Sequence, residues 1–383
     1  MKGHRLLVPA VAAVALIASF AVGFELQTQS LTEPKPPPRP TSLRTQVLDD
    51  LEAYYYRALP RGVYRTRSVS AMLRRLGDPY TRYLPPTAYR QLKSAESGTY
   101  RGVGLTLHRA GQGLLVTASL PGLPGRAAGI RPGDVITTID GTSLASLSYQ
   151  RALDLIGGRV GTRLHLEVMR TGQLDPMSLT LVRKPIELPS VITRVVHAGG
   201  MRVCVIRLVS FPATAAARVR EAATRARRRH EGVILDLRGN PGGLLSQAVA
   251  VVRVFANKGV VVTTSGRHEP ARDFVADGTD VGPLPMAVLI NGGTASAAEA
   301  VAGALHADAG ALLVGRRTYG KGTVQAVEPL ANGGALKLTV AGFQLPGGVA
   351  VEGRGIAPDL PVSAKAGPTD RVLEAALHAL RTL

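Results

Sequence analysis

Residues 287–308 read AVLINGGTASAAEAVAGALHAD, and this stretch decides how the surrounding chain is interpreted. Its first four residues suit a buried strand, the NGG triplet is a turn signal, and Thr294 with Glu299 opens an alanine-rich helical segment. Ser296 is therefore expected where a strand turns into a helix. The unpaired N–H groups and positive dipole end of a helix start favour a nucleophile that creates an oxyanion. A serine there is also a common helix cap, so this stretch alone leaves both roles open.

The chain has 383 residues, enough for two or three domains, and a formal charge of +19. Basic residues are scattered apart from Arg225–Arg229, without a zinc-finger, helix-turn-helix or aromatic pattern. We expect no nucleic-acid partner, although binding of an anionic polymer through the arginine-rich surface is a further hypothesis. Cys204 is the only cysteine and the eight histidines have no ligand spacing, so we expect no metal and no cofactor.

The N-terminus predicts export. Three basic residues precede an apolar run from Leu6 to Phe24, which is typical of an export signal and long enough to remain as a membrane anchor. Residues 19–21 (SFA) suit cleavage, and between the two outcomes we favour the anchor. We therefore interpret residues 1–24 as a signal peptide or anchor, residues 25–41 as a proline-rich linker, and the rest as an extracytoplasmic part in the cell envelope.

Residues 42–98 have apolar residues at helical spacing and predict an N-terminal helical segment. From 99 to 184, short strands alternate with glycine turns. The sequence RGVGL at 101–105 places two glycines before an alternating strand, and such a loop can turn N–H groups toward an anion. The sequence PGRAAGIRPGDVI follows at 124–136, and IDG at 139–141.

Residues 99–184 thus resemble a PDZ domain, with Gly102, Val103, Gly104 and Leu105 as its carboxylate-binding loop. PDZ domains bind C-terminal tails by strand addition. The alternative is another small β fold in which these glycines only form turns.

Strands and helices alternate over residues 185–365, which predicts an α/β domain, and a C-terminal helix is expected over 366–383. The strand at 232–237 runs into a second glycine-rich junction. Pro241 occupies the position of an attacking group there, so Gly242 and Gly243 can supply oxyanion donors but no nucleophile.

Lys321 lies between two glycines beside an apolar strand, an unusual place for a solvated lysine. Burial would lower its pKa from about 10.4 toward 7–8 and make it a general base. Gln325 is four residues further on, so one helical turn would put its amide on the same face.

Five motifs together resemble the C-terminal processing (tail-specific) peptidases, the S41 family of Ser/Lys proteases. They are DLRGNPGG (236–243), NGGTASAAE (291–299), GKGTVQ (320–325), GALKLT (334–339) and GRGIAPD (353–359). The resemblance covers roughly residues 42–365. It implies a multidomain α+β protein with an N-terminal helical segment, a β-rich PDZ domain and an α/β peptidase core of the ClpP/crotonase-like type.

By this resemblance Ser296 is the nucleophile, Lys321 the general base and Gln325 the residue that positions the base. The oxyanion hole would use the N–H of Ala297 and that of Gly242 or Gly243. Ala298 and Ala300 stand where the family often has Ser and Ile, and neither position needs a hydroxyl for the chemistry.

A Ser-His-Asp site is the competing mechanism. His306 follows Ser296 by ten residues, about 15 Å along a helix, which is too far for a hydrogen bond. Geometry does not exclude His268, but no catalytic motif surrounds it. We therefore favour the Ser/Lys mechanism.

The expected function is that of a serine endopeptidase of the cell envelope, which captures free, apolar C-termini of protein substrates through its PDZ domain. The resemblance also suggests an arginine on a late PDZ strand that couples the PDZ domain to the site. An activator or adaptor protein is a further candidate partner, and the sequence does not decide whether the enzyme needs one. Arg170 is our candidate for this arginine, against the alternative of a solvated strand end. A non-catalytic PDZ scaffold is the alternative function, and the presence of all three dyad-region residues argues against it.

Overall fold

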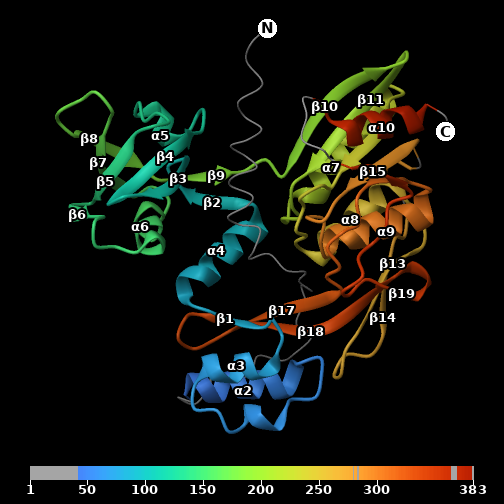
Figure 1. The fold of residues 1–383 in the computed structure, drawn as a ribbon, viewed down its shortest axis with the longest axis horizontal. Helices are drawn as coiled ribbons and strands as arrows, with labels where there is room; N and C mark the ends of the chain where they lie inside the picture. Colours follow the sequence, from blue (N-terminus) through green and yellow to red (C-terminus); the bar gives the residue numbers. More distant parts are fainter. Residues whose placement is uncertain (1–41, 279, 283, 364–368, 382–383) are drawn as a thin grey trace. The chain divides into compact units, whose positions relative to one another are not determined.

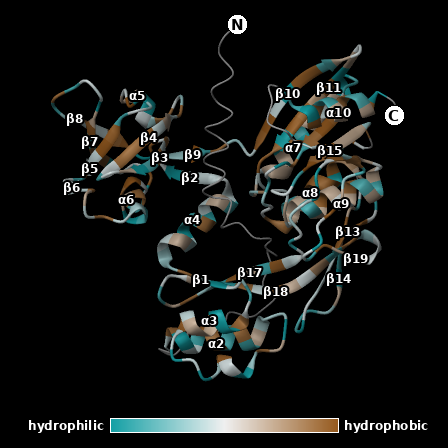
Figure 2. Ribbon diagram, in the orientation of Figure 1, coloured by the Kyte–Doolittle hydropathy of each residue, from teal (hydrophilic) through white to brown (hydrophobic). Residues whose placement is uncertain are grey.

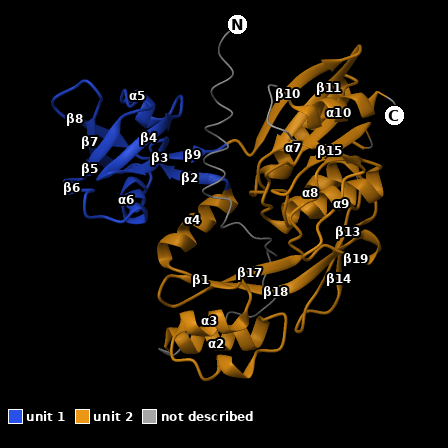
Figure 3. Cartoon of the chain, in the orientation of Figure 1, with its two compact units in different colours: residues 1–20, 98–188 blue, residues 21–97, 189–383 orange. Residues whose placement is uncertain are grey.

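The computed structural model describes residues 42–278, 280–282, 284–363 and 369–381 (Figure 1). The predicted export segment and proline-rich linker lie outside the described residues. In the part of the chain that is described, no helix is long and apolar enough to cross a membrane. The described residues form two compact units, one over residues 98–188 and one that combines residues 42–97 with the chain from residue 189 onward (Figure 3).

The first unit is an antiparallel β structure with two short helices. Its main sheet has the strand order β3-β4-β5-β7-β8, with β6 paired to β5, while β2 and β9 form a separate antiparallel pair. Its elements are β2 (Thr99–Gly102), β3 (Leu105–Ala110), β4 (Gly113–Ser119), α5 (Pro124–Ala127), β5 (Val135–Ile139), β6 (Thr142–Ser143), α6 (Tyr149–Ile156), β7 (Arg163–Met169), β8 (Met177–Val182) and β9 (Lys184–Glu187). Alternate strand residues, such as Leu164, Leu166 and Val168, face its core.

The second unit begins with helices whose ends are set by local chemistry. These elements are α2 (Leu43–Tyr54), the 3₁₀ turn η1 (Arg61–Val63), α3 (Val69–Leu76), β1 (Arg82–Leu84) and α4 (Pro86–Ser97). The side chains of Ser42 and Ser68 cap α2 and α3, and Gly77 ends α3 in the left-handed conformation. The predicted helical segment is thus present, with a short strand between its helices.

A six-stranded sheet forms the centre of this unit, in the order β10-β11-β12-β15-β16-β20. All its pairs are parallel except β10–β11. Its strands and helices are β10 (Val191–Ala198), β11 (Met201–Leu208), α7 (Ala215–Arg228), β12 (Gly232–Asp236), α8 (Leu245–Phe255), β15 (Met286–Ile290), α9 (Ala297–Ala309), β16 (Leu312–Gly315), β20 (Leu360–Pro361) and α10 (Arg371–Leu380). The predicted alternation of strands and helices after residue 185 is confirmed.

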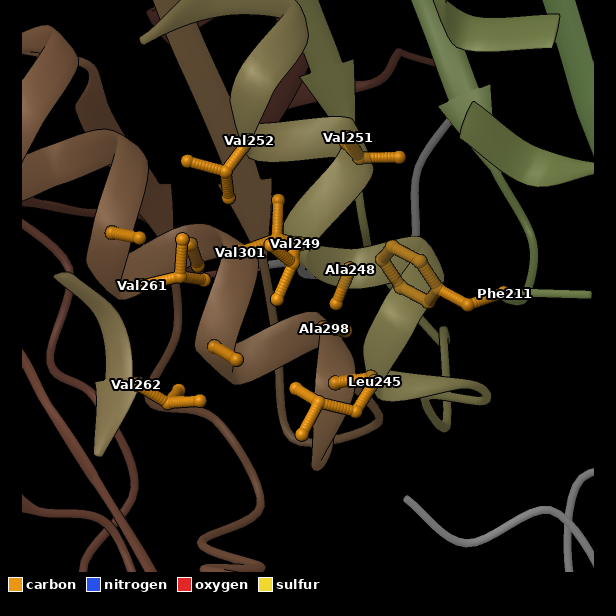
Figure 4. Close-up of a cluster of buried hydrophobic side chains, with 14 of the residues drawn as sticks. Phe211, Leu245, Ala248, Val249, Val251, Val252, Val261, Val262, Ala298 and Val301 are labelled. Carbon is orange, nitrogen blue, oxygen red and sulfur yellow. The ribbon is translucent and has the colours of Figure 1, made fainter. Parts of the chain in front are cut away.

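Helices cover both faces of this sheet, which explains why its central strands β12 and β15 are buried throughout and mostly apolar (Figure 2). Val288 and Ile290 face a core shared with α7, α8 and α9, whereas Ala287 and Leu289 face α10. Figure 4 shows side chains of α8 and α9 packed together beside Phe211 and Val261.

A second sheet lies at the edge of this unit, in the order β1-β18-β13-β14, with β17 and β19 also paired to β18. Its remaining elements are β13 (Val260–Ser265), β14 (Arg272–Val275), β17 (Thr323–Pro329), β18 (Ala335–Leu345), the 3₁₀ turn η2 (Pro346–Gly348) and β19 (Val349–Ala350). Because β17 begins two residues after Lys321, this sheet positions the predicted base. Because β1 pairs with β18, it also ties the N-terminal helical segment to the same place.

Candidate active site

Ser296 lies at the junction between β15 and α9, as predicted. It is fully buried and has φ 58° and ψ −121°, a conformation that costs a non-glycine residue on the order of 1–3 kcal/mol. The turn before it is fixed by Thr294, whose hydroxyl accepts the Asn291 N–H at 3.0 Å and donates to the Leu237 carbonyl at 2.8 Å. The Ser296 hydroxyl itself makes no hydrogen bond within the described chain, so it is available for chemistry.

The glycine junction at 239–243 contacts this serine. A Cβ added to Gly242 would lie 3.0 Å from the Ser296 Cβ and 3.1 Å from the Ala297 nitrogen, at φ 100°, so a side chain would be both strained and crowded. The Gly242 N–H already donates to Asn240 Oδ1 at 2.8 Å. By contrast, the N–H groups of Gly243 and Ala297 have no acceptor among the described residues. Of the two predicted glycine donors, the arrangement favours Gly243.

Asn240 holds the two junctions together. Its backbone carbonyl accepts the Ala295 N–H at 2.9 Å, and its side-chain amide donates to the Leu208 carbonyl at 2.9 Å. Arg238 adds paired hydrogen bonds to Asp236 and to Asp370, the cap of α10. These contacts hold the glycine junction beside the loop that carries Ser296.

Glu299 connects the nucleophile to the loop that carries Lys321. One carboxylate oxygen accepts the Ser296 N–H at 2.8 Å and the Lys321 N–H at 2.9 Å. The other accepts the Gly320 N–H at 2.8 Å and the Thr318 hydroxyl. Burial raises the pKa of this carboxyl, and the four hydrogen bonds oppose that rise. Sequence reasoning noted Glu299 only as a helix opener, although its position three residues after a capping serine was the signal for this contact.

Lys321 is buried, and desolvation lowers the pKa of its amine to about 7. The nearby charge of Lys337 lowers that pKa further, whereas the carboxylates of Glu352 and Asp78 raise it. Among the described residues, Nζ makes one hydrogen bond, to Gln325 Oε1 at 2.7 Å. A substantial fraction of this amine is therefore neutral near neutral pH and has a lone pair with which to accept a proton.

The structure places Gln325 beside Lys321, but not by the geometry that the sequence suggested. The predicted helical turn is wrong, because Lys321 lies in a loop and Gln325 on strand β17. The Gln325 side chain reaches Nζ from the strand, at a register shift between Val324 and Gln325 in the pairing with β18. The amide nitrogen of Gln325 is held by the hydroxyls of Thr323 and Thr339, at 3.0 and 3.4 Å, which leaves its oxygen directed at the amine.

Ser296 and Lys321 are brought to the same buried region without a hydrogen bond between their side chains. Neither does any histidine of the described chain bond to the Ser296 hydroxyl. His306 instead contacts the Ala311 carbonyl at 3.0 Å and the Asp359 carboxylate at 3.4 Å, and His268 is exposed. The competing histidine mechanism thus gains no support.

In the β-rich unit, the loop Gly102–Leu105 connects β2 to β3. The carbonyls of Val103 and Gly104 accept the N–H groups of Gly125 and Leu120, at 2.7 and 2.9 Å. The Gly104 N–H has no acceptor among the described residues. The loop is therefore fixed through its carbonyls and keeps a donor for an incoming anion.

Arg170 lies just after β7 and is not a plain solvated strand end. Its guanidinium makes two 2.8 Å hydrogen bonds to Asp134 and one of 2.8 Å to the Gly129 carbonyl. The bond to Arg170 holds the pKa of Asp134 below its usual value. These partners belong to the β-rich unit, and a role in coupling that unit to the active site stays a prediction.

Fold and site together define a peptidase, with an α/β unit that carries the candidate chemistry and a β-rich unit of PDZ type. The sequence profile of peptidase family S41 matches residues 202–362, and a PDZ-domain profile matches residues 115–170. The chain belongs to peptidase family S41 and is similar to carboxyl-terminal-processing proteases.

Relatives and a solved structure support this assignment. A carboxyl-terminal-processing protease of Synechocystis sp. (strain ATCC 27184 / PCC 6803 / Kazusa) is 35% identical over 312 residues, which cover 80% of this chain and 73% of the relative. The carboxy-terminal processing protease CtpA of Bacillus subtilis (strain 168) is 30% identical over 314 residues, 82% of this chain and 66% of the relative. A solved photosystem II D1 C-terminal processing protease is 28% identical, with a TM-score of 0.53 over 88% of this chain and 96% of that one.

Proposed function

We propose that this protease cleaves its substrates with a Ser/Lys dyad, in which Ser296 is the nucleophile and Lys321 the general base. The observation that carries the proposal is the buried Lys321 amine. Its pKa is about 7, and it donates a hydrogen bond to Gln325. The Glu299 carboxylate ties the loop that carries Lys321 to the Ser296 backbone.

The chemistry follows from these positions. Neutral Nζ accepts the Ser296 hydroxyl proton as Oγ attacks the carbonyl carbon of the scissile bond. The N–H groups of Ala297 and Gly243 receive the negative charge that develops on the carbonyl oxygen. When the C–N bond breaks, Nζ returns its proton to the leaving amine. Neutral Nζ then takes a proton from water as its oxygen attacks the carbonyl carbon of the acyl ester. When the ester C–O bond breaks, Nζ returns that proton to Ser296 Oγ, and the product leaves with a free carboxyl group.

Attack requires the Ser296 hydroxyl to come within hydrogen-bond distance of Nζ. We propose that substrate binding closes this gap, since catalytic hydrogen bonds often tighten only in the complex. The strained Ser296 backbone and the Glu299 link limit the motion to a small rearrangement of two joined loops.

We further propose that the PDZ unit captures the free C-terminus of a protein substrate. The donor-bearing loop Gly102–Leu105 suits a terminal carboxylate, and the neighbouring strands suit an extended tail. The proposal has three further parts. The chain is exported to the cell envelope, it is anchored by residues 6–24, and it works with an activator or adaptor protein. The first two rest on the basic and apolar pattern of the N-terminal sequence.

The test compares the full chain with Ser296→Ala and Lys321→Ala on an unstructured polypeptide that ends in apolar residues. We expect the wild type to cleave it, with a rate that rises through about pH 7, and both variants to lose activity. Lys93→Ala is the matched control, because Lys93 is exposed and stacks on Tyr89 away from the site. A substrate with an amidated C-terminus should be cleaved more slowly.

Two results would contradict the proposal. Cleavage that survives in Lys321→Ala would exclude the dyad. Tail binding without cleavage by the wild type would favour the non-catalytic scaffold instead. For export, a protease added to intact cells should degrade the chain if its main part lies outside the membrane, and protection from that protease would contradict the localisation.

A further inference from the structure

Residues 77–84, which link α3 to α4, lie against the strand that supports the candidate base, although they are more than two hundred residues away in the sequence. Thr81 is buried and donates from its hydroxyl to Asp78 Oδ2 at 2.6 Å. The same hydroxyl accepts the Thr339 N–H at 3.0 Å, on strand β18. The Thr339 hydroxyl in turn accepts from Gln325 at 3.4 Å. The linking segment therefore belongs to the hydrogen-bonded surroundings of the base.

Tyr80 is fixed within this segment from both sides. Its N–H donates to Asp78 Oδ1 at 2.9 Å, and the next residues pair with β18, with Arg82 opposite Lys337 (Figure 1). Its hydroxyl lies close enough to that of Tyr319, on the loop that leads to the base, for the two groups to interact. The Tyr80 ring is thus held by the N-terminal segment and lies beside the Lys321 loop.

The ring that results stands over the base. Lys321 Nζ lies 4.7 Å from the centroid of the Tyr80 ring, and the same nitrogen donates a hydrogen bond to Gln325 Oε1. An aromatic face attracts an ammonium group and also keeps water away from a neutral amine.

We propose that Tyr80 is a positioning residue for the general base, whose ring closes the Lys321 pocket and holds Nζ against Gln325. The N-terminal helical segment would then complete the active site instead of serving only as a support. The inference rests on the proposed role of Lys321 and adds a residue to it.

The direction of the expected effect follows from the groups around Nζ. The charges that face it are those of Lys337, Arg82, Glu352 and Asp78, and replacing a neutral ring leaves all four in place. Loss of the ring removes an attraction for the ammonium, which lowers the pKa of Lys321, and admits water, which raises it. Burial is the largest influence on this amine, so the second effect should win and the pKa should rise.

The experiment measures kcat/KM against pH for the full chain and for Tyr80→Phe, Tyr80→Leu and Tyr80→Met. Tyr80→Phe keeps the ring and should keep the wild-type profile. In Tyr80→Leu the acid limb should move up by about one pH unit, with a roughly tenfold loss at pH 6 that disappears above pH 9. Tyr80→Met gives a second readout with a side chain of different shape, should Tyr80→Leu fail to fold.

Tyr89→Leu is the matched control. Tyr89 is half-buried on α4, and the exposed Lys93 lies over its ring at the same 4.7 Å, so removing that ring should leave the pH profile unchanged. A Tyr80→Leu profile that falls equally at every pH would assign Tyr80 a structural role only and overturn the proposal. An unchanged Tyr80→Leu profile would overturn it as well.

A measurement without substrate separates this inference from the proposed function. A fluorophosphonate that modifies Ser296 should react with the wild type at a rate that follows the same acid limb, and the limb should shift in Tyr80→Leu. If the wild type is not modified and does not cleave, the proposed dyad fails, and the inference with it. If the wild type reacts and the limb stays in place in Tyr80→Leu, only the role of Tyr80 is refuted.

Discussion

Replacing Lys321 by Met should stabilise the folded protein, and by an amount that depends on pH. The folded-state pKa of this amine is about 7, against 10.5 for an ordinary lysine. Between these values the unfolded chain binds more protons than the folded chain, so wild-type stability rises with pH in this window. The cost of burying the amine is about 4 kcal/mol at pH 7 and about 2 kcal/mol at pH 9.

Methionine occupies a similar volume and does not titrate. The free energy of unfolding of the variant therefore lacks the pH dependence that Lys321 gives the wild type. Its advantage in free energy of unfolding over the wild type should therefore shrink by about 2 kcal/mol between pH 7 and pH 9. The lost hydrogen bond to Gln325 lowers the stability of the variant equally at both pH values and cancels in this difference.

Urea unfolding at the two pH values gives the measurement, with both proteins in a Ser296→Ala background to prevent self-cleavage. The unfolding transition whose urea midpoint shifts in Lys321→Met is that of the unit that contains Lys321. Lys93→Met, at an exposed lysine, should produce no such pH-dependent difference. Parallel stability curves for Lys321→Met and wild type would refute the reasoning, because they would mean that the amine is not desolvated.

Three further substitutions test the surroundings of the site. Glu299→Gln replaces one of the two carboxylate oxygens by an amide NH2, so two of the four hydrogen bonds lose their acceptor. It should lower the free energy of unfolding by about 2–4 kcal/mol and kcat by at least about 100-fold, as urea unfolding and kinetics would measure. Near-normal kcat would mean that the link is dispensable. Gly242→Ala places a Cβ against the proposed nucleophile and should lower kcat by about 10²–10³. Gly239→Ala is the control, because Gly239 also has a positive φ but lies in open space, and this variant should keep its kcat. Equal losses of kcat in the two variants would point to backbone strain alone. Gly104→Ala would put a Cβ 2.4 Å from a leucine side chain and should raise KM by about tenfold or more, with kcat retained. Gly111→Ala, in an open turn, is the control. An unchanged KM in Gly104→Ala would mean that this loop does not bind the substrate tail.

The local features of the site could be predicted from the sequence because short-range patterns encode them. The glycine turn before Ser296 and the apolar run ahead of it required a strand–helix junction. The glycines around Lys321 indicated a constrained loop. Gln325 was identified by its spacing, yet its position on a strand was missed, because a spacing of four residues does not distinguish a helical turn from a sharp loop that enters a strand.

Contacts between distant parts of the chain could not be predicted in this way. Tyr80 meets Lys321 only because β1 pairs with β18, a register that depends on tertiary packing. Likewise, the commitment of the Gly242 N–H to Asn240 is a property of the folded loop, and it decides which glycine can serve as an oxyanion donor. The glycine-rich sequence itself left both glycines equivalent.

The central claim is that Lys321 activates Ser296. The most direct measurement is the pH dependence of Ser296 modification by a fluorophosphonate, with the modified residue identified by mass spectrometry in wild type and in Lys321→Ala. We predict a single adduct on Ser296, formed at a rate that rises with pH through about 7 and is lost in Lys321→Ala. An adduct on another residue, or one that forms equally fast without Lys321, would contradict the account.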